Sequence, residues 1–227
     1  MLHELRLYHA MPGRLDELAE RIGHVMVPYF ARHGFPPRLG QWTVSAGFST
    51  PMFAWLLAWP GGLDQRTACF SALGADAEWN AIRIATNGPG EMVRRYDLRF
   101  LTPSPIIRDD APDPVAAPAP VDAHLFELRV HDVAVGSMPQ VHEALRASHL
   151  PALRESGARV LGVFDNQSGP ATPGVTLLLG WRGYPDRREA LRLDQSRPDA
   201  SVLGPCAALL LDATPYGQPN EGLRAAL

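Results

Sequence analysis

One pattern of residues occurs twice along the 227-residue chain, in the same order and at nearly the same spacing. The segment Glu4–Leu7 recurs 123 positions later as Glu127–Val130. The apolar run Trp55–Trp59 recurs 122 positions later as Leu177–Trp181. The offset of 123 also relates Gly13 to Gly136, Pro28 to Pro151 and Gly34 to Gly157. Matches that keep their order and register indicate an internal duplication, so one small unit must fold twice.

A proline-rich stretch separates the two copies. Between Pro103 and Pro120 the chain has six prolines and three aspartates, a composition typical of an extended linker rather than a packed element. We therefore expect a first unit at 1–104, a linker at 105–121 and a second unit at 122–227. Each unit is about as long as a small domain.

Each unit has the residue pattern of a β-α-β-β-α-β fold, the ferredoxin-like order. In the first unit the expected strands are 2–8, 38–45, 53–59 and 93–101, with helices from 15 to 33 and at 63–73 and 77–86. In the second unit the expected strands are 125–131, 158–164, 175–181 and 206–212, with a shorter second helical region near 185–197. A single sheet with helices on one face leaves its other face bare, and two such sheets cover each other by packing together. The predicted fold class is therefore α+β, an intramolecular pseudo-dimer with its two sheets face to face.

The first strand alternates between apolar and polar residues, so its two faces differ. Leu5 and Leu7 are expected to pack on the helices, which places Glu4, Arg6 and Tyr8 between the sheets. A buried Glu–Arg pair that fixes how the halves dock is the favoured interpretation. The alternative is a set of groups for acid–base chemistry or anion binding. The matching residues of the second copy are Glu127, Arg129 and His131.

The first copy resembles a known protein family. The segments that carry the resemblance are Glu4-Leu5-Arg6-x-Tyr8, Pro12-Gly13, Gly40-x-Trp42, the tryptophan-bearing strand at 53–59 and Asp76-x-Glu78-Trp79. Together they resemble the NIPSNAP domain over most of the first copy, whereas the second copy has diverged and lacks the last of these segments. The resemblance implies the dimeric α+β barrel superfold, which hosts enzymes that need no cofactor as well as haem enzymes. It implies no single activity, because fold does not determine chemistry.

Three histidines of the second copy are the strongest candidates for chemistry. His142 and His149 are seven residues apart, hence on one helix face, and His149 stands where the first copy has an apolar Met26. His131 stands where the first copy has Tyr8, and a histidine titrates near neutral pH. We therefore list His142, His149, His131 and Tyr8 as candidate acid–base residues. The alternative is that these rings lie at partly solvated helix edges.

The candidate ligand-binding residues combine charged and aromatic side chains. A pocket lined by tryptophans would suit a flat apolar or aromatic ligand. The residues expected to bind substrate are Glu4, Arg6, Trp42, Trp55, Trp59, Glu127, Arg129 and Trp181. No metal motif and no organic cofactor is implied, because two histidines without a third ligand are a weak metal signal.

The composition excludes several classes of partner. The net charge of −3 provides no basic excess for nucleic acid, and no apolar run approaches the roughly 20 residues of a membrane helix. The two cysteines lie far apart in no motif, and the first residues do not resemble a secretory signal, so we expect a cytoplasmic protein. A small-molecule ligand is the expected partner. Internal pairing removes the usual reason to form a homo-oligomer without forbidding one.

Three functional hypotheses follow. The first is a small-molecule-binding protein that acts as a cofactor-independent acid–base enzyme on an apolar or aromatic substrate. The second is a binding or scaffold protein without catalysis, because each candidate residue also has a structural explanation. The third is a haem protein that uses His142 or His149 as the iron ligand.

Overall fold

The structure, a computed structural model, describes residues 1–108, 123–195 and 200–216 of the chain. Within these residues both halves have the predicted order of strands and helices. The first half consists of β1 (Leu2–Ala10), α1 (Leu15–Glu20), α2 (Val27–Arg32), β2 (Arg38–Ala46), β3 (Met52–Trp59), α3 (Gly62–Ala75), α4 (Ala77–Asn87) and β4 (Val93–Pro103). The second consists of β5 (Leu125–Asp132), α6 (Met138–Ala144), α7 (Leu150–Glu155), β6 (Arg159–Asn166), β7 (Gly174–Trp181), α8 (Tyr184–Gln195), a 3₁₀ turn (Ala200–Leu203) and β8 (Cys206–Ala213).

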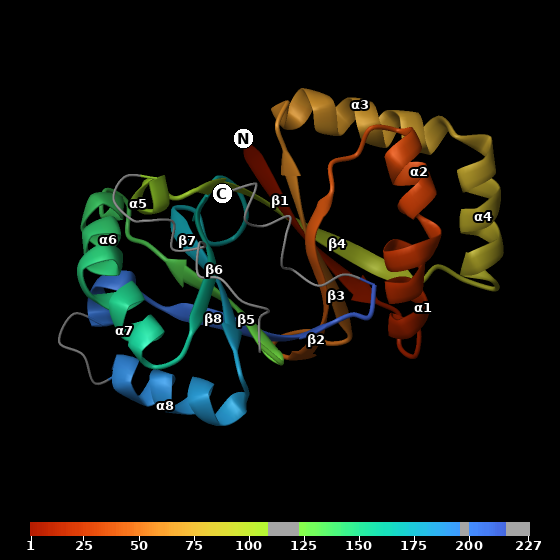
Figure 1. Cartoon of the computed structure of the whole chain (residues 1–227). Coiled ribbons are helices and arrows are strands. Elements are labelled where there is room, and N and C mark those ends of the chain that lie inside the picture. The colour runs from red at the N-terminus through yellow and green to blue at the C-terminus, as the bar shows by residue number, and fades with distance from the viewer. Residues whose placement is uncertain (109–122, 196–199, 217–227) are drawn as a thin grey trace.

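The eight described strands close into one barrel in the order β1-β3-β2-β8-β5-β7-β6-β4. The halves join at two antiparallel seams, where Trp42 of β2 is opposite Ala213 of β8 and Leu101 of β4 is opposite Asn166 of β6. Figure 1 shows α1 to α4 outside the first sheet and α6 to α8 outside the second. The predicted pseudo-dimer is therefore confirmed, and the two sheets are also hydrogen-bonded to each other at both edges.

The orientation of β1 is the opposite of the one expected. Leu5 and Leu7 belong to the apolar cluster that fills the barrel, together with Phe126 of the other half. Glu4 and Tyr8 face the helices instead, and Tyr8 packs in the helix-side cluster of the first half. Alternation separates the two faces of a strand, but both faces of this sheet are covered, so the pattern could not say which face was the inner one.

Both halves repeat the same irregularities of the backbone. The first helix of each half is interrupted by a π-helical turn, at Arg21–Val25 in one half and Leu145–His149 in the other. The peptide bonds Thr50–Pro51 and Thr172–Pro173 are both cis. A π turn widens the helix and frees backbone carbonyls for other partners. The π turn that both halves share supports the duplication independently of side-chain identity.

The start of the expected linker is ordered. Pro105–Arg108 form a single helical turn, α5, and Ile106 packs against the apolar cluster of the second half. The expectation of an unpacked linker is therefore wrong for these residues, because an apolar side chain inside the segment reaches the second core. The rest of the linker, 109–122, lies outside the described residues. No helix among the described residues is long and apolar enough to cross a membrane.

Candidate functional site

A buried carboxylate, Glu4, lies at the centre of a polar cluster between β1, β3 and α3. Its Oε2 accepts hydrogen bonds from Trp59 Nε1 at 3.0 Å and from Arg66 Nε at 2.9 Å. Its Oε1 accepts from Arg66 Nη2 at 2.9 Å and from Arg6 Nη1. Charge-assisted bonds of this kind are the strong ones in proteins, and here they compensate a charge that has no contact with solvent.

The second half repeats this cluster around Glu127. Trp181 Nε1 donates to Glu127 Oε2 at 2.9 Å, Arg187 Nη2 donates to Oε1 at 2.8 Å, and Arg129 Nε forms an ion pair with Oε1 at 3.0 Å. Sequence reasoning found the strand residues but missed Arg66 and Arg187, which lie on helices outside the matched segments. Because both copies saturate the carboxylate in the same way, the arrangement favours a structural role, in which the cluster fixes a helix on each sheet.

The guanidinium of Arg6 lies among aromatic rings. Its Cζ is 4.5 Å from the ring centre of Phe70, 5.3 Å from that of Tyr8 and 5.5 Å from that of Trp55, and its Nε donates to the Tyr8 hydroxyl at 2.9 Å. Burial alone would lower the pKa of Arg6, but the neighbouring Tyr8 and Glu4 outweigh burial and raise it. Burial raises the pKa of Tyr8, so this phenol is protonated at neutral pH.

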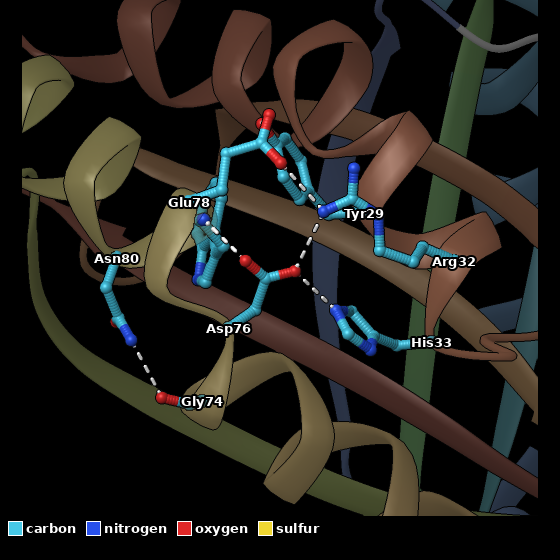
Figure 2. Close-up of polar contacts among 8 residues, drawn as sticks. Tyr29, Arg32, His33, Gly74, Asp76, Glu78 and Asn80 are labelled. Atoms are coloured by element: carbon cyan, nitrogen blue, oxygen red, sulfur yellow. Dashed lines mark hydrogen bonds and ion pairs between the residues drawn. The ribbon is translucent and has the colours of Figure 1, made fainter.

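The Asp76-x-Glu78-Trp79 segment connects α4 to α2. Asp76 is the N-cap of α4, and its carboxylate accepts from the Trp79 backbone N–H at 3.0 Å. The same carboxylate lies 2.7 Å from His33 Nε2 and 3.1 Å from Arg32 Nη1, and Glu78 accepts a second bond from Arg32 at 2.8 Å. Figure 2 shows these side chains converging on Asp76 and Glu78. The Trp79 N–H, followed by His33, lowers the pKa of Asp76 to about 2. The segment thus has a structural explanation.

We expect the charge of Asp76 to stabilise the fold only above acidic pH. Its folded-state pKa of about 2 lies below its ordinary value of 3.8, so the stabilisation is complete above pH 4 and is lost as the pH falls through 2. Asp76→Asn keeps an oxygen for the Trp79 N–H and removes the charge. Thermal unfolding should show a lower Tm for the variant at pH 7 and a much smaller difference in Tm at pH 2. An equal difference at both pH values would contradict this account.

The candidate histidines all lie in the helix–sheet layer of the second half. His142 Nε2 is 3.0 Å from Asp165 Oδ1 of β6, and both side chains are about one-fifth exposed. His149 lies in the π turn and His131 on β5, and both are buried. Asp165 was missed because no pattern in the sequence links it to the histidines. The pair joins α6 to the sheet and places the imidazole beside solvent.

The described residues around these histidines do not fit a haem. The iron-binding nitrogen that His142 would offer, Nε2, faces Asp165. Between the helices and the sheet, Val141, Leu145 and Val163 are fully buried members of one packed apolar cluster. A haem would have to displace this packing. Among the described residues, no three His, Cys, Asp or Glu side chains are grouped as metal ligands.

A cavity of about 360 Å³ lies at the end of β7, and Trp181 is the candidate residue that lines it. Its charged lining residues are of both signs, namely Glu155, Arg159, Arg182 and Asp186. Such a lining is well hydrated and offers few apolar contacts, so this cavity is a poor match for the aromatic ligand expected from the sequence.

A second cavity, of about 370 Å³, lies in the first half beside α2 and β2. This volume is within the range of small-ligand sites. Tyr216, which follows the last strand of the second half, forms part of its wall, so both halves contribute to it. The other lining residues are mostly apolar: Val27, Phe30, Ala31, Phe35, Pro36, Pro37, Arg38, Gly40 and Gln41.

Two polar side chains stand in this apolar wall. Arg38 Nη1 donates to Gln41 Oε1 at 3.1 Å and to the Ile22 carbonyl, and its Nη2 donates to the Gly23 carbonyl at 3.4 Å. Both carbonyls belong to the π turn. Gln41 is 1% exposed, and its Nε2 has no hydrogen-bond partner among the described residues. Because Arg38 holds Oε1, the amide donors are fixed in place, and a buried unpaired donor is costly unless a ligand satisfies it.

Sequence reasoning missed this site although a signal was present. Strand alternation places Gln41 on the face opposite Trp42, and Trp42 faces the barrel interior. The Gly40-x-Trp42 segment therefore marked a strand whose intervening residue faces the helices. Of the other candidates, Glu4, Arg6, Tyr8, Trp55 and Trp59 lie together in the helix–sheet layer of the first half.

Comparisons with known proteins find a family that matches the first half of the chain. A family model described as NIPSNAP matches residues 3–108. An uncharacterised NIPSNAP domain protein from Burkholderia xenovorans is 23% identical, covering 46% of this chain and 95% of its own, with a TM-score of 0.37. A NIPSNAP family protein from Agrobacterium tumefaciens is 18% identical, covering 49% and 96%, with a TM-score of 0.39.

Over the whole chain, the similarity is to a different group. A mutant chlorite dismutase from Candidatus Nitrospira defluvii covers 98% of this chain and 95% of its own at 9% identity, with a TM-score of 0.60. A putative chlorite dismutase covers 100% and 99% at 10% identity, with a TM-score of 0.55. At these identities the likeness shows the fold alone. None of the curated proteins compared with the chain matches it in sequence.

Proposed function

Residues 3–108 belong to the NIPSNAP family, and within this dimeric α+β barrel fold we propose that the cavity between α2 and β2 binds a small molecule. The observation that carries the proposal is the buried amide of Gln41, whose Nε2 donors have no hydrogen-bond partner in the described part of the chain. A ligand oxygen would complete their hydrogen bonds. The first half is then the binding half, rather than the histidine-bearing second half.

The lining defines the chemistry of the ligand. Phe30, Phe35 and Tyr216 present rings that suit a flat apolar or aromatic body. Arg38 places a guanidinium next to the Gln41 amide, and burial lowers the pKa of Arg38, as expected for a poorly hydrated cation. A cation and an amide donor side by side favour an anionic oxygen. We therefore propose an aromatic or apolar carboxylate as the ligand class.

Exchange of Gln41 for Glu tests the role of the amide. The side chain keeps its size and an oxygen for Arg38, but it loses the donors and gains a charge that repels a carboxylate. Titration of the protein with 2-naphthoate, followed by ligand fluorescence, should show saturable binding by the wild type. Gln41→Glu should weaken it at least about tenfold, because a hydrogen bond to a charged group contributes roughly 1.5–3 kcal/mol.

The control is Gln65→Glu, the same exchange on α3, where the side chain only accepts from the Gly61 N–H. It should bind as the wild type does. Equal affinities of the wild type and Gln41→Glu for 2-naphthoate would show that the Gln41 amide does not bind the ligand. No saturable binding of 2-naphthoate to the wild type would contradict the proposed ligand class.

Acid–base catalysis on a small molecule bound at the second half, apart from the α2–β2 cavity, is a second candidate function, favoured by the His142–Asp165 pair. A ring that donates Nε2–H to Asp165 keeps Nδ1 as its basic nitrogen. Proton exchange into an aromatic ketone, followed by NMR in D₂O, would reveal such a base. Undiminished exchange with His142→Gln would exclude this residue. His131, His149 and Tyr8 are candidates of lower rank, because all three are buried.

A further inference from the structure

One end of the barrel interior is lined by charged residues of β4. Arg99 pairs with Leu5 of β1 and Asp97 pairs with Leu7. Both leucines face the interior of the barrel, and directly paired residues of antiparallel strands point to the same side. Arg99 and Asp97 therefore also face inward, on the side of the sheet away from the helices and from the α2–β2 cavity.

The carboxylate of Asp97 already contacts two other side chains, His9 and Arg95. His9 Nε2 lies 2.8 Å from Asp97 Oδ2. Arg95 contacts the same carboxylate at 3.4 Å, and its Nη2 is 3.2 Å from His9 Nε2. These three side chains contact one another at the mouth of the barrel, and none of them accepts a hydrogen bond from Arg99.

The side chain of Arg99, unlike its backbone, makes no hydrogen bond or ion pair with any described residue. It is 7% exposed, and its Nε is enclosed without an acceptor. Asp97 and Asp132 act on it only through space, and burial lowers the pKa of Arg99. The β6–β7 turn of the other half covers its stem, since a Cβ at Gly169 would lie 3.4 Å from Arg99 Cγ. An enclosed guanidinium N–H without an acceptor is costly.

The duplication shows that the barrel does not need this charge. Arg99 pairs with Leu5, and at the equivalent place in the second half Leu209 pairs with Leu128. Leu209 is 3% exposed and packs in the core of the barrel. One fold thus accepts a leucine at this position in one half and holds an arginine there in the other. The arginine is therefore not explained by packing.

We propose that Arg99 binds an oxyanion, a carboxylate or a phosphate group, at this end of the barrel. The planar guanidinium offers two parallel N–H donors, which match both groups. Because His9 and Arg95 take up the charge of Asp97, the guanidinium remains available. This site is separate from the α2–β2 cavity and does not depend on the function proposed for it.

Thermal unfolding of the full-length protein in different salts tests this site. Sodium phosphate and sodium acetate are compared with sodium chloride at equal ionic strength, pH 7 and roughly 100 mM anion. At least one oxyanion should raise the Tm by about 3 °C over chloride, as expected for a ligand of roughly 10 mM affinity. Arg99→Leu should lose this increment. The anion that acts identifies the ligand group as a phosphate or a carboxylate.

The matched control is Arg94→Leu, an exposed arginine on the same strand. It should keep the full increment, which separates the site from general salt effects on stability. Arg99→Gln, which also lacks the cation, replaces Arg99→Leu if the latter does not fold. An unchanged increment in the Arg99 variant overturns the proposal, and so does the absence of any increment in the wild type.

Discussion

Replacing Glu4 by Gln is expected to lower the free energy of unfolding by about 3–5 kcal/mol, the cost of removing one partner from a buried ion pair. In the folded protein the Glu4 carboxylate accepts from Trp59, Arg66 and Arg6. A Gln side chain has one oxygen, and its NH₂ would face a donor. Two guanidiniums would then lack their counter-charge, and that of Arg6 is buried. Urea unfolding followed by circular dichroism measures the loss.

The control for this prediction is Glu17→Gln. Glu17 also pairs with an arginine, Arg14, at 2.7 Å, but its side chain is 51% exposed. Exposed pairs of this kind contribute 1 kcal/mol or less, so the control should change stability by no more than about that amount. Glu127→Gln should behave like Glu4→Gln, because it occupies the same place in the repeated cluster. A loss below about 1 kcal/mol for Glu4→Gln would mean that the cluster is not structural.

Replacing Trp42 by Ala should cost a similar amount, about 3–5 kcal/mol, and should destabilise both halves together. Trp42 was expected to bind substrate, but it lies in the barrel interior, 1% exposed, with its ring centre 6.2 Å from that of Phe126 in the other half. Its side chain belongs to a core that residues of both halves build. Calorimetry should therefore show one transition, shifted to lower temperature.

The variant Trp42→Phe separates the effect of lost packing volume from the effect of losing the indole N–H. The Nε1 of Trp42 has no hydrogen-bond partner among the described residues, so phenylalanine loses only part of the packing and no hydrogen bond. Its cost should be well under half that of Trp42→Ala. If the alanine variant instead unfolds in two separate steps, the barrel is not a single cooperative unit and the proposed coupling of the halves is wrong.

The repeat, the order of strands and helices, and the pseudo-dimer could all be predicted from the sequence. These features depend on local patterns: alternation in strands, helical periodicity, and matches such as Gly34 with Gly157 that keep their register. The sequence could not show whether Glu4 or Leu5 faces the barrel interior. A sheet that is covered on both sides has no solvent-exposed face to reveal its orientation.

The site depended on contacts that local patterns do not contain. Arg66 and Arg187 reach their glutamates from a helix about 60 residues away, and the partner of His142 is 23 residues away on another strand. Gln41 stands out only when its partner Arg38 and the carbonyls of the π turn are placed in space. Periodicity treats the helix from 15 to 33 as regular, so the turn that creates those acceptors was not expected.

The tandem arrangement changes what a barrel of this kind can tolerate. In a homodimer built from one copy per chain, every residue occurs twice, once on each side of the two-fold axis. A cation in the barrel would then oppose its own image and would be repelled. Here the two sides are encoded separately, so Arg99 stands in one half while Leu209 occupies the same position in the other. Fusion of the two copies therefore allows the barrel to contain one charged residue in one half only. A symmetric homodimer could not do this, because each residue would occur in both subunits.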